Sequence, residues 1–170
     1  MRKILLFLLA LFLVLCVYLW DKGKDYHVVQ TEIEISASPE KVWAVLVDIG
    51  SWHEWSPIIN DSSGDASLSS ILSITMRGEK EYQDGPKYHP VITRLDAPKV
   101  FHWRAVMMNS IVMTNDKVIE LEKTSAGTRL VHKELFKGMV VPLLSNKFDE
   151  NVPHMLSAMN EALKARVEKK

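Results

Sequence analysis

The stretch ISASPEKVWAVLVDIGSWHEWSP, from Ile35 to Pro57, decides the fold of this chain. It follows residues 29–35, in which apolar and polar side chains alternate as in a half-buried strand. Ser38 is a residue type that caps the start of a helix, and the proline after it suits the first helical turn. Beyond Gly50, which is typical of a helix end, a second short helix is predicted. That second helix carries a pair of tryptophans, Trp52 and Trp55.

The rest of the chain predicts an antiparallel sheet followed by one long helix. Apolar residues recur with the helical period along the C-terminal segment, at Phe148, Val152, Met155, Leu156, Met159, Leu163 and Val167. Pro153 lies inside this pattern, so the helix must kink there or start again. A long amphipathic helix needs a concave apolar surface, which a curled sheet provides. The predicted class is therefore α+β, with six to seven strands around the C-terminal helix, including 71–77, 88–95, 100–107, 113–123 and 128–137.

Five segments resemble proteins of the SRPBCC superfamily, also called START-like or helix-grip proteins. SPEKVW at 38–43 and DIGSWHEWSP at 48–57 are similar to the opening of its polyketide cyclase/dehydrase and lipid-transport-like branch. Residues 90–98 and 101–104 look like its middle strands, and 127–138 like its last strand. The resemblance implies the helix-grip fold. It implies no particular ligand and no catalytic residues, because the superfamily includes lipid carriers, cyclases and hormone receptors.

The N-terminal segment is predicted to be a single-pass membrane anchor. Residues 4–20 are apolar and uncharged, which is at the short end of what a bilayer-spanning helix needs. A cleaved signal peptide is the alternative, but it needs small residues before the cut site, and none is well placed. Basic residues slightly favour a cytoplasmic N-terminus, which puts the domain outside the cytoplasm, on the periplasmic side of a bacterium. We therefore expect an anchor with a short connector at 1–25 and one folded domain at 26–170.

Composition argues against several classes of function. The chain has 21 basic and 21 acidic residues, and no basic block is interleaved with aromatic residues, so a nucleic-acid partner is not predicted. The histidines lack metal-ligand spacing, and Cys16, the one cysteine of the sequence, lies in the predicted anchor. The sequence contains no glycine-rich phosphate loop and no Gly-x-Ser-x-Gly motif. We therefore predict neither a metal nor a cofactor.

The space between sheet and helix is the predicted binding site. On strand 100–107 the aromatic residues alternate with His102 and Arg104, which predicts that those two polar residues face solvent. On the last strand, His132 and Glu134 are predicted to point inward, either as ligand contacts or as a hydrogen-bonded core pair. Methionine suits surfaces that accept varied apolar ligands, but it also serves as ordinary core filler. The predicted ligand-binding residues are Trp52, Trp55, Met76, Phe101, Trp103, Met113, His132, Glu134, Met155 and Met159.

The sequence is compatible with three functions. The first is a membrane-tethered module that binds a lipid or another hydrophobic small molecule between sheet and helix. The second is a cyclase-, dehydratase- or hydrolase-like enzyme in the same cavity, with His132 and Glu134 as weak acid–base candidates. The third is an envelope interaction module with a filled core and no ligand. An internal cavity distinguishes the first two from the third.

Overall fold

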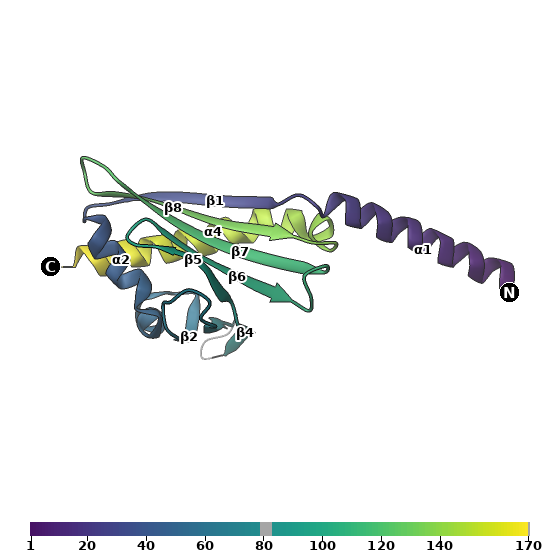
Figure 1. The fold of residues 1–170 in the computed structure, drawn as a ribbon, viewed down its shortest axis with the longest axis horizontal. Coiled ribbons are helices and arrows are strands. Elements are labelled where there is room, and N and C mark those ends of the chain that lie inside the picture. Colours follow the sequence, from purple (N-terminus) through teal and green to yellow (C-terminus); the bar gives the residue numbers. More distant parts are fainter. Residues whose placement is uncertain (79–82, 170) are drawn as a thin grey trace.

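The computed structural model describes residues 1–78 and 83–169, and it has the predicted α+β class (Figure 1). In these residues the elements follow the order α1 (Arg2–Lys22), β1 (His27–Ile35), α2 (Pro39–Val47), the 3-10 helix η1 (Ile49–Ser51), α3 (Trp52–Trp55), β2 (Ile59–Ser63), β3 (Ser73–Arg77), β4 (Asp84–Tyr88), β5 (Val91–Asp96), β6 (Val100–Met107), β7 (Met113–Lys123), β8 (Thr128–Lys137) and α4 (Val141–Glu168).

The strands form two antiparallel sheets within the described part of the chain. The larger sheet has the order β1-β8-β7-β6-β5, and the smaller has the order β2-β3-β4. An isolated bridge pairs Ile71, which lies just before β3, with Val91 of β5. The sequence predicts a loop over 60–70, where most of β2 forms, and a turn over 78–87, where β4 forms. The part of that turn at 79–82 lies outside the described residues.

The core lies between the larger sheet and α4, which runs along the concave face of the sheet (Figure 1). Phe101 on β6 and Leu130 on β8 are fully buried there. The predicted apolar stripe of α4 packs into this core, with Leu156 and Leu163 both buried. Pro153 lies within one continuous helix, so α4 does not start again at this residue. The apolar face of the sheet therefore packs against the apolar face of α4, as the sequence predicts.

The two short helices close the end of the domain that lies away from α1. Pro39 occupies the first turn of α2, as predicted. Trp52 is fully buried, and its indole Nε1 donates a hydrogen bond to the carbonyl oxygen of Leu46 at 3.0 Å. Glu54 makes no cap with Ser51; its carboxylate instead accepts a hydrogen bond from Nη2 of Arg166 at 2.9 Å. The short helices are thus fastened to the far end of α4.

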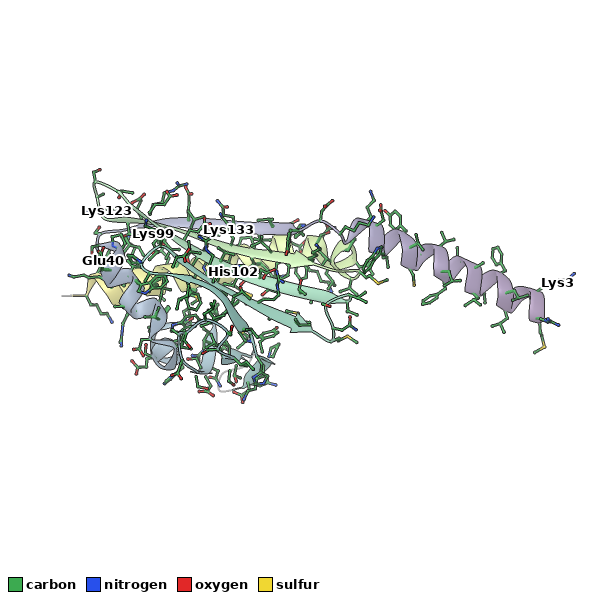
Figure 2. The ribbon with its side chains drawn as sticks, in the orientation of Figure 1. Lys3, Glu40, Lys99, His102, Lys123 and Lys133 are labelled. Carbon is green, nitrogen blue, oxygen red and sulfur yellow. The ribbon has the colours of Figure 1, made fainter. Side chains whose placement is uncertain are left out.

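Helix α1 extends away from the domain, and Lys3 lies near its distant end (Figure 2). It is 21 residues long and apolar, with none of its span buried against the domain. By length and composition it is the one helix in the described residues that could cross a membrane. A helix with these properties at the N-terminus also fits a signal sequence.

Candidate functional site

A cavity of about 370 Å³ lies between α4 and the two sheets. This volume falls within the roughly 300–1,000 Å³ that is usual for small-molecule sites. The exposed residues Lys147, Asn151 and Met155 of α4 edge its opening. The other lining residues are Trp52, Ile58, Ile59, Ile74, Met76, Tyr88, Pro90, Trp103, Ala105, Met107, Met113, Asn115, Lys117, Glu134, Phe136, Phe148, Val152, Leu156 and Met159. The enclosed space is therefore largely apolar, with few polar groups.

Aromatic pairs and methionines form most of the apolar wall. The rings of Trp52 and Trp103 lie 5.4 Å apart at a tilt of 45°, and those of Phe136 and Phe148 stack at 4.0 Å. Each pair joins a strand of the large sheet to a helix across the cavity wall. Methionine side chains adapt to irregular apolar shapes, and five of them line the space: Met76, Met107, Met113, Met155 and Met159.

A buried ion pair supplies the polar part of the wall. Nζ of Lys117 on β7 lies 2.5 Å from Oε1 of Glu134 on β8, and these side chains are 9% and 10% exposed. The side-chain amide of Asn115, two residues before Lys117 and on the same strand face, donates to the other carboxylate oxygen. The Lys117 ammonium also lies 5.8 Å from the ring centre of Trp103. The three polar side chains together carry no net charge.

Behind this ion pair, a directed series of hydrogen bonds reaches α4 and β1. An ammonium group can only donate, so Nε2 of His132 accepts from Lys117, at 2.9 Å. The proton of the neutral ring is then on Nδ1, which donates to Oδ1 of Asn160 at 2.8 Å. The Asn160 amide in turn donates to the Thr31 hydroxyl at 3.0 Å. Every polar side chain in the series therefore has a partner.

Burial is the main reason that His132 stays neutral. The side chain is fully buried, and desolvation, followed by the charge of Lys117, holds its pKa well below the ordinary value of 6.5. Tyr88 forms part of the cavity wall and remains a phenol, because burial and then the charge of Glu134 raise its pKa. The cavity wall thus includes the neutral side chain of Tyr88 and the paired charges of Lys117 and Glu134.

The structure brings seven of the ten predicted ligand-binding residues to the cavity wall: Trp52, Met76, Trp103, Met113, Glu134, Met155 and Met159. His132 points inward and is buried, but it lies behind Lys117 and does not line the cavity. Phe101 is fully buried in the core. Trp55 packs edge-on against Trp52, with ring centres 6.3 Å apart, and is not among the lining residues. These last three positions therefore support the site without touching its space.

Sequence reasoning missed Asn115, Lys117 and Asn160. A signal was present for each. Asn115 and Lys117 occupy the face of β7 that continues into the buried residues Ile119 and Leu121. Asn160 lies on the same helical face as the buried apolar residues around it. A polar residue placed in register with buried apolar ones was the feature to look for.

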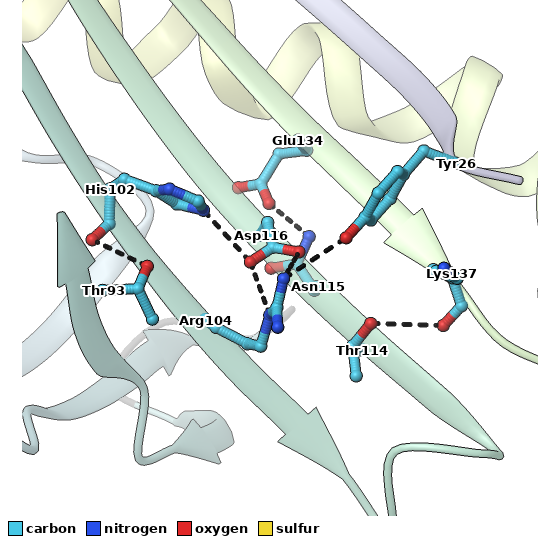
Figure 3. A network of polar contacts seen from close by, with 9 residues as sticks. All are labelled: Tyr26, Thr93, His102, Arg104, Thr114, Asn115, Asp116, Glu134 and Lys137. Atoms are coloured by element: carbon cyan, nitrogen blue, oxygen red, sulfur yellow. Dashed lines mark hydrogen bonds and ion pairs between the residues drawn. The ribbon is translucent and has the colours of Figure 1, made fainter.

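The outer face of the sheet carries a separate polar cluster (Figure 3). Asp116 points away from the cavity, unlike its neighbour Asn115, and accepts from Nε and Nη2 of Arg104 at 2.8 and 3.0 Å. Nε2 of His102 lies 3.1 Å from the same carboxylate. Burial opposes ionisation of Asp116, but the hydrogen bonds from His102 and Arg104 outweigh it and lower the pKa. The predicted outward orientation of His102 and Arg104 is confirmed.

The described residues contain no group of three or more His, Cys, Asp or Glu side chains that could hold a metal ion. The donors in the cavity do not form such a site either, because the Lys117 ammonium occupies the space beside the Glu134 carboxylate. The side chains that line the cavity themselves offer hydrogen bonds, apolar contact and proton transfer.

Solved structures with the same architecture share little sequence with this chain. The di-domain aromatase/cyclase StfQ from the steffimycin biosynthetic pathway has a TM-score of 0.69 and 9% identity; the match covers 85% of this chain and 52% of StfQ. The aromatase/cyclase ZhuI from Streptomyces sp. R1128 has a TM-score of 0.66 and 16% identity, over 83% of this chain and 93% of ZhuI. A point mutant of norcoclaurine synthase from Thalictrum flavum has a TM-score of 0.62 and 16% identity, over 82% of this chain and 92% of the synthase.

These likenesses establish the fold alone. No curated protein sequence matches the chain. The model of one protein family, described as polyketide cyclase/dehydrase and lipid transport, matches residues 26–169, which is nearly all of the chain outside α1 and its connector. With the curved sheet, the long helix and the cavity between them, that match makes the chain a member of the polyketide cyclase/dehydrase and lipid transport family within the SRPBCC superfamily.

Proposed function

We propose that this chain is a membrane-tethered protein that binds an uncharged, largely apolar small molecule in the cavity under α4. The cavity of about 370 Å³, with its wall of aromatic and methionine side chains, is the observation that carries the proposal. Binding there removes apolar surface of the ligand from water, which is the main driving force for such complexes. The cavity supports ligand binding over an interaction module, for which we expect a filled core.

The polar part of the wall selects the chemistry of the ligand. Lys117 directs two of its three donors to Glu134 and His132, which leaves one N–H for a group in the cavity. The ion pair is already balanced, so a charge placed beside it, away from Lys147 at the opening, would be buried without a partner, which is unfavourable. A carbonyl, ester or hydroxyl group on an apolar body therefore fits better than a carboxylate or an amine.

The tether rests on α1. Its apolar side chains are exposed along the whole helix, and a helix of this length and composition is stable inside a bilayer. An uncleaved helix would hold the domain at the membrane surface, where apolar ligands concentrate. Arg2 and Lys3 lie at the end of α1 that is distant from the domain. Because basic residues favour the cytoplasmic side, they favour a cytoplasmic N-terminus and a domain outside the cytoplasm.

A filled cavity is expected to lose its ligand. Ala105 lies on the cavity wall, and Ala105→Phe places a phenyl ring in that space. We expect the variant to bind the uncharged fluorophore N-phenylnaphthylamine about tenfold or more weakly than the wild type, a loss of at least about 1.4 kcal/mol. The full chain in lipid nanodiscs is titrated, and energy transfer from its tryptophans reports the saturable component above that of empty nanodiscs.

The matched control is Val106→Phe, which adds a ring at the next position of β6. Val106 is exposed on the opposite face of the sheet, so this variant is expected to bind like the wild type. Circular dichroism confirms that both variants are folded. Wild-type protein without a saturable component, or equal binding by Ala105→Phe, contradicts the proposed site.

Acid–base catalysis is the second candidate, because an ionisable pair lies on the cavity wall. Lys117 and Glu134 replace the His132 and Glu134 pair expected from the sequence, since His132 does not line the cavity. The variant Glu134→Gln keeps the side-chain shape but cannot take up a proton. If the cavity is catalytic, this variant binds a ligand without converting it, and mass spectrometry of the extracted ligand distinguishes the two cases.

A further inference from the structure

A second apolar surface lies at the end of the domain next to α1. The turn between β6 and β7, residues 107–113, reads MMNSIVM and contains no charged side chain. Met108 is 90% exposed and Ile111 is 51% exposed. In the neighbouring first turn of α4, Leu143 is 65% exposed. Apolar side chains gathered at one end of a domain usually mark a surface that meets a partner. We call residues 107–113 the tip.

The backbone of the tip is built to project Met108. The side-chain oxygen of Asn109 accepts hydrogen bonds from the amides of Ile111 and Val112, at 3.0 Å each. Met108 has a φ of 64°, in the left-handed region that is unfavourable for residues other than glycine. The turn therefore holds the large apolar side chain of Met108 outward, although the backbone conformation at this position favours glycine or asparagine.

The tip is joined to the end of α1 through the turn before α4. The amide of Met139 donates to the carbonyl of Ile111 at 3.0 Å, and the amide of Gly138 donates to the carbonyl of Gly23 at 3.1 Å. A small cavity of about 180 Å³ is lined by both Ile111 and Trp20, the latter on the last turn of α1. Ile111 therefore lies beside the helix, in the region where Figure 1 shows α1 meeting the strands.

The connector between α1 and β1 is also held in place. The hydroxyl of Tyr26 accepts a hydrogen bond from Nη2 of Arg104 at 3.2 Å, and the Lys137 ammonium lies 5.2 Å from the centre of the Tyr26 ring (Figure 3). A Cβ atom added at Gly23 would come within 2.3 Å of the Gly138 carbonyl oxygen, so the two backbones approach as closely as glycine permits. The contacts give the domain a preferred orientation on α1.

We propose that the tip rests in the interfacial region of the same bilayer that α1 enters, as a second membrane contact. This inference rests on the proposed tether. If α1 lies in a bilayer, the lipid around it also reaches the residues beside the last turn of α1. An uncharged turn with exposed Met and Ile side chains suits the boundary between headgroups and acyl chains. Lys22, exposed at the end of α1, can meet lipid phosphates, whereas Lys24 pairs with Asp21 at 2.6 Å.

The base of the tip forms part of the cavity wall. Met107 and Met113, which form its base, line the cavity wall. The tip and the cavity therefore share these two methionines.

Site-specific fluorescence of the full chain in vesicles tests the proposal. Three single-cysteine proteins carry an environment-sensitive nitrobenzoxadiazole label: the native Cys16 protein, and Met108→Cys and Ser125→Cys, each made in a Cys16→Ser background. Ser125 is exposed in the turn between β7 and β8, close to Lys123 at the end of the domain away from α1 (Figure 2). The vesicles contain phosphatidylcholine, a minority of phosphatidylglycerol, and lipids with a doxyl quencher at a shallow or a deep acyl position.

We expect the shallow quencher to remove most of the emission of the label at position 108 and to leave that at position 125 unchanged. The label at Cys16 is expected to respond to the deep quencher, which verifies the tether. A quenched Cys16 label beside an unquenched, iodide-accessible label at 108 overturns the proposed tip contact but leaves the tether intact. A label at 108 that neither iodide nor lipid quenches is covered by protein, such as a second copy, and also overturns it. If lipid quenches neither the label at Cys16 nor the label at position 108, the tether itself is contradicted.

Discussion

Replacing Lys117 with methionine is expected to lower the free energy of unfolding by about 3–5 kcal/mol, because the buried Glu134 carboxylate loses its ion-pair partner. Methionine keeps most of the length of the lysine side chain and removes the charge. His132 loses the donor to its Nε2 atom as well. Denaturant unfolding of the full chain in one detergent, followed by the near-ultraviolet circular dichroism of its aromatic residues, measures the change.

The outer face of the sheet supplies a matched control for this variant. Lys133 pairs with Glu120 at 2.7 Å, but both side chains are partly exposed to solvent. The variant Lys133→Met is therefore expected to lose less than about 1 kcal/mol. In the double variant Lys117→Met/Glu134→Leu no unpaired charge remains, so much of the lost stability should return. Equal losses from Lys117→Met and Lys133→Met would show that burial of the inner pair has no energetic weight.

Acidification is expected to destabilise the domain through His132. In the unfolded chain this histidine takes up a proton below about pH 6.5, whereas in the folded chain burial and the charge of Lys117 keep it neutral. Because the unfolded state binds more protons in this range, stability is lost as the pH falls from about 6.5 toward the lowered pKa of the folded state. The loss grows as the pH falls through this range and ends once the pH is below the lowered pKa of the folded state.

Unfolding curves measured across this pH range for the wild type and for His132→Gln isolate the effect. Glutamine does not titrate, so the variant should show a flatter dependence on pH, whatever its absolute stability. His53→Gln, at an exposed position on α3, is the control and should follow the wild type. Parallel curves for the wild type and His132→Gln would mean that the folded state admits the proton.

Strand alternation and the helical stripe predicted the large sheet and α4, because the buried face of a long amphipathic strand or helix can be read from the pattern of its own residues. The face of Trp103, for example, followed from its neighbours on β6. The small sheet was harder to predict. Its strands β2 and β4 have the sequences INDSS and DGPKY, whose Asn, Asp, Ser, Gly and Pro residues favour turns. Both strands pair with β3, which lies between them, and this pairing overrides the preference for turns.

The polar network could be predicted only in part, for a different reason. Alternation on β8 correctly turned His132 and Glu134 inward, but it could not show which of them reaches the cavity. That depends on Lys117 from the adjacent strand, which stands between His132 and the open space. The bond between Asn160 and Thr31 joins residues 129 positions apart in the sequence. Such contacts depend on strand register and helix placement, which no local pattern determines.

The connector between α1 and β1 is only residues 23–26, and it is hydrogen-bonded to the domain. Even fully extended, it would span about 14 Å. If the protein is anchored as proposed above, it diffuses laterally in the membrane, and its short connector keeps the domain close to the membrane surface. It would therefore exchange its ligand with the membrane in which it is anchored, and transfer to another membrane would require a second, freely diffusing carrier.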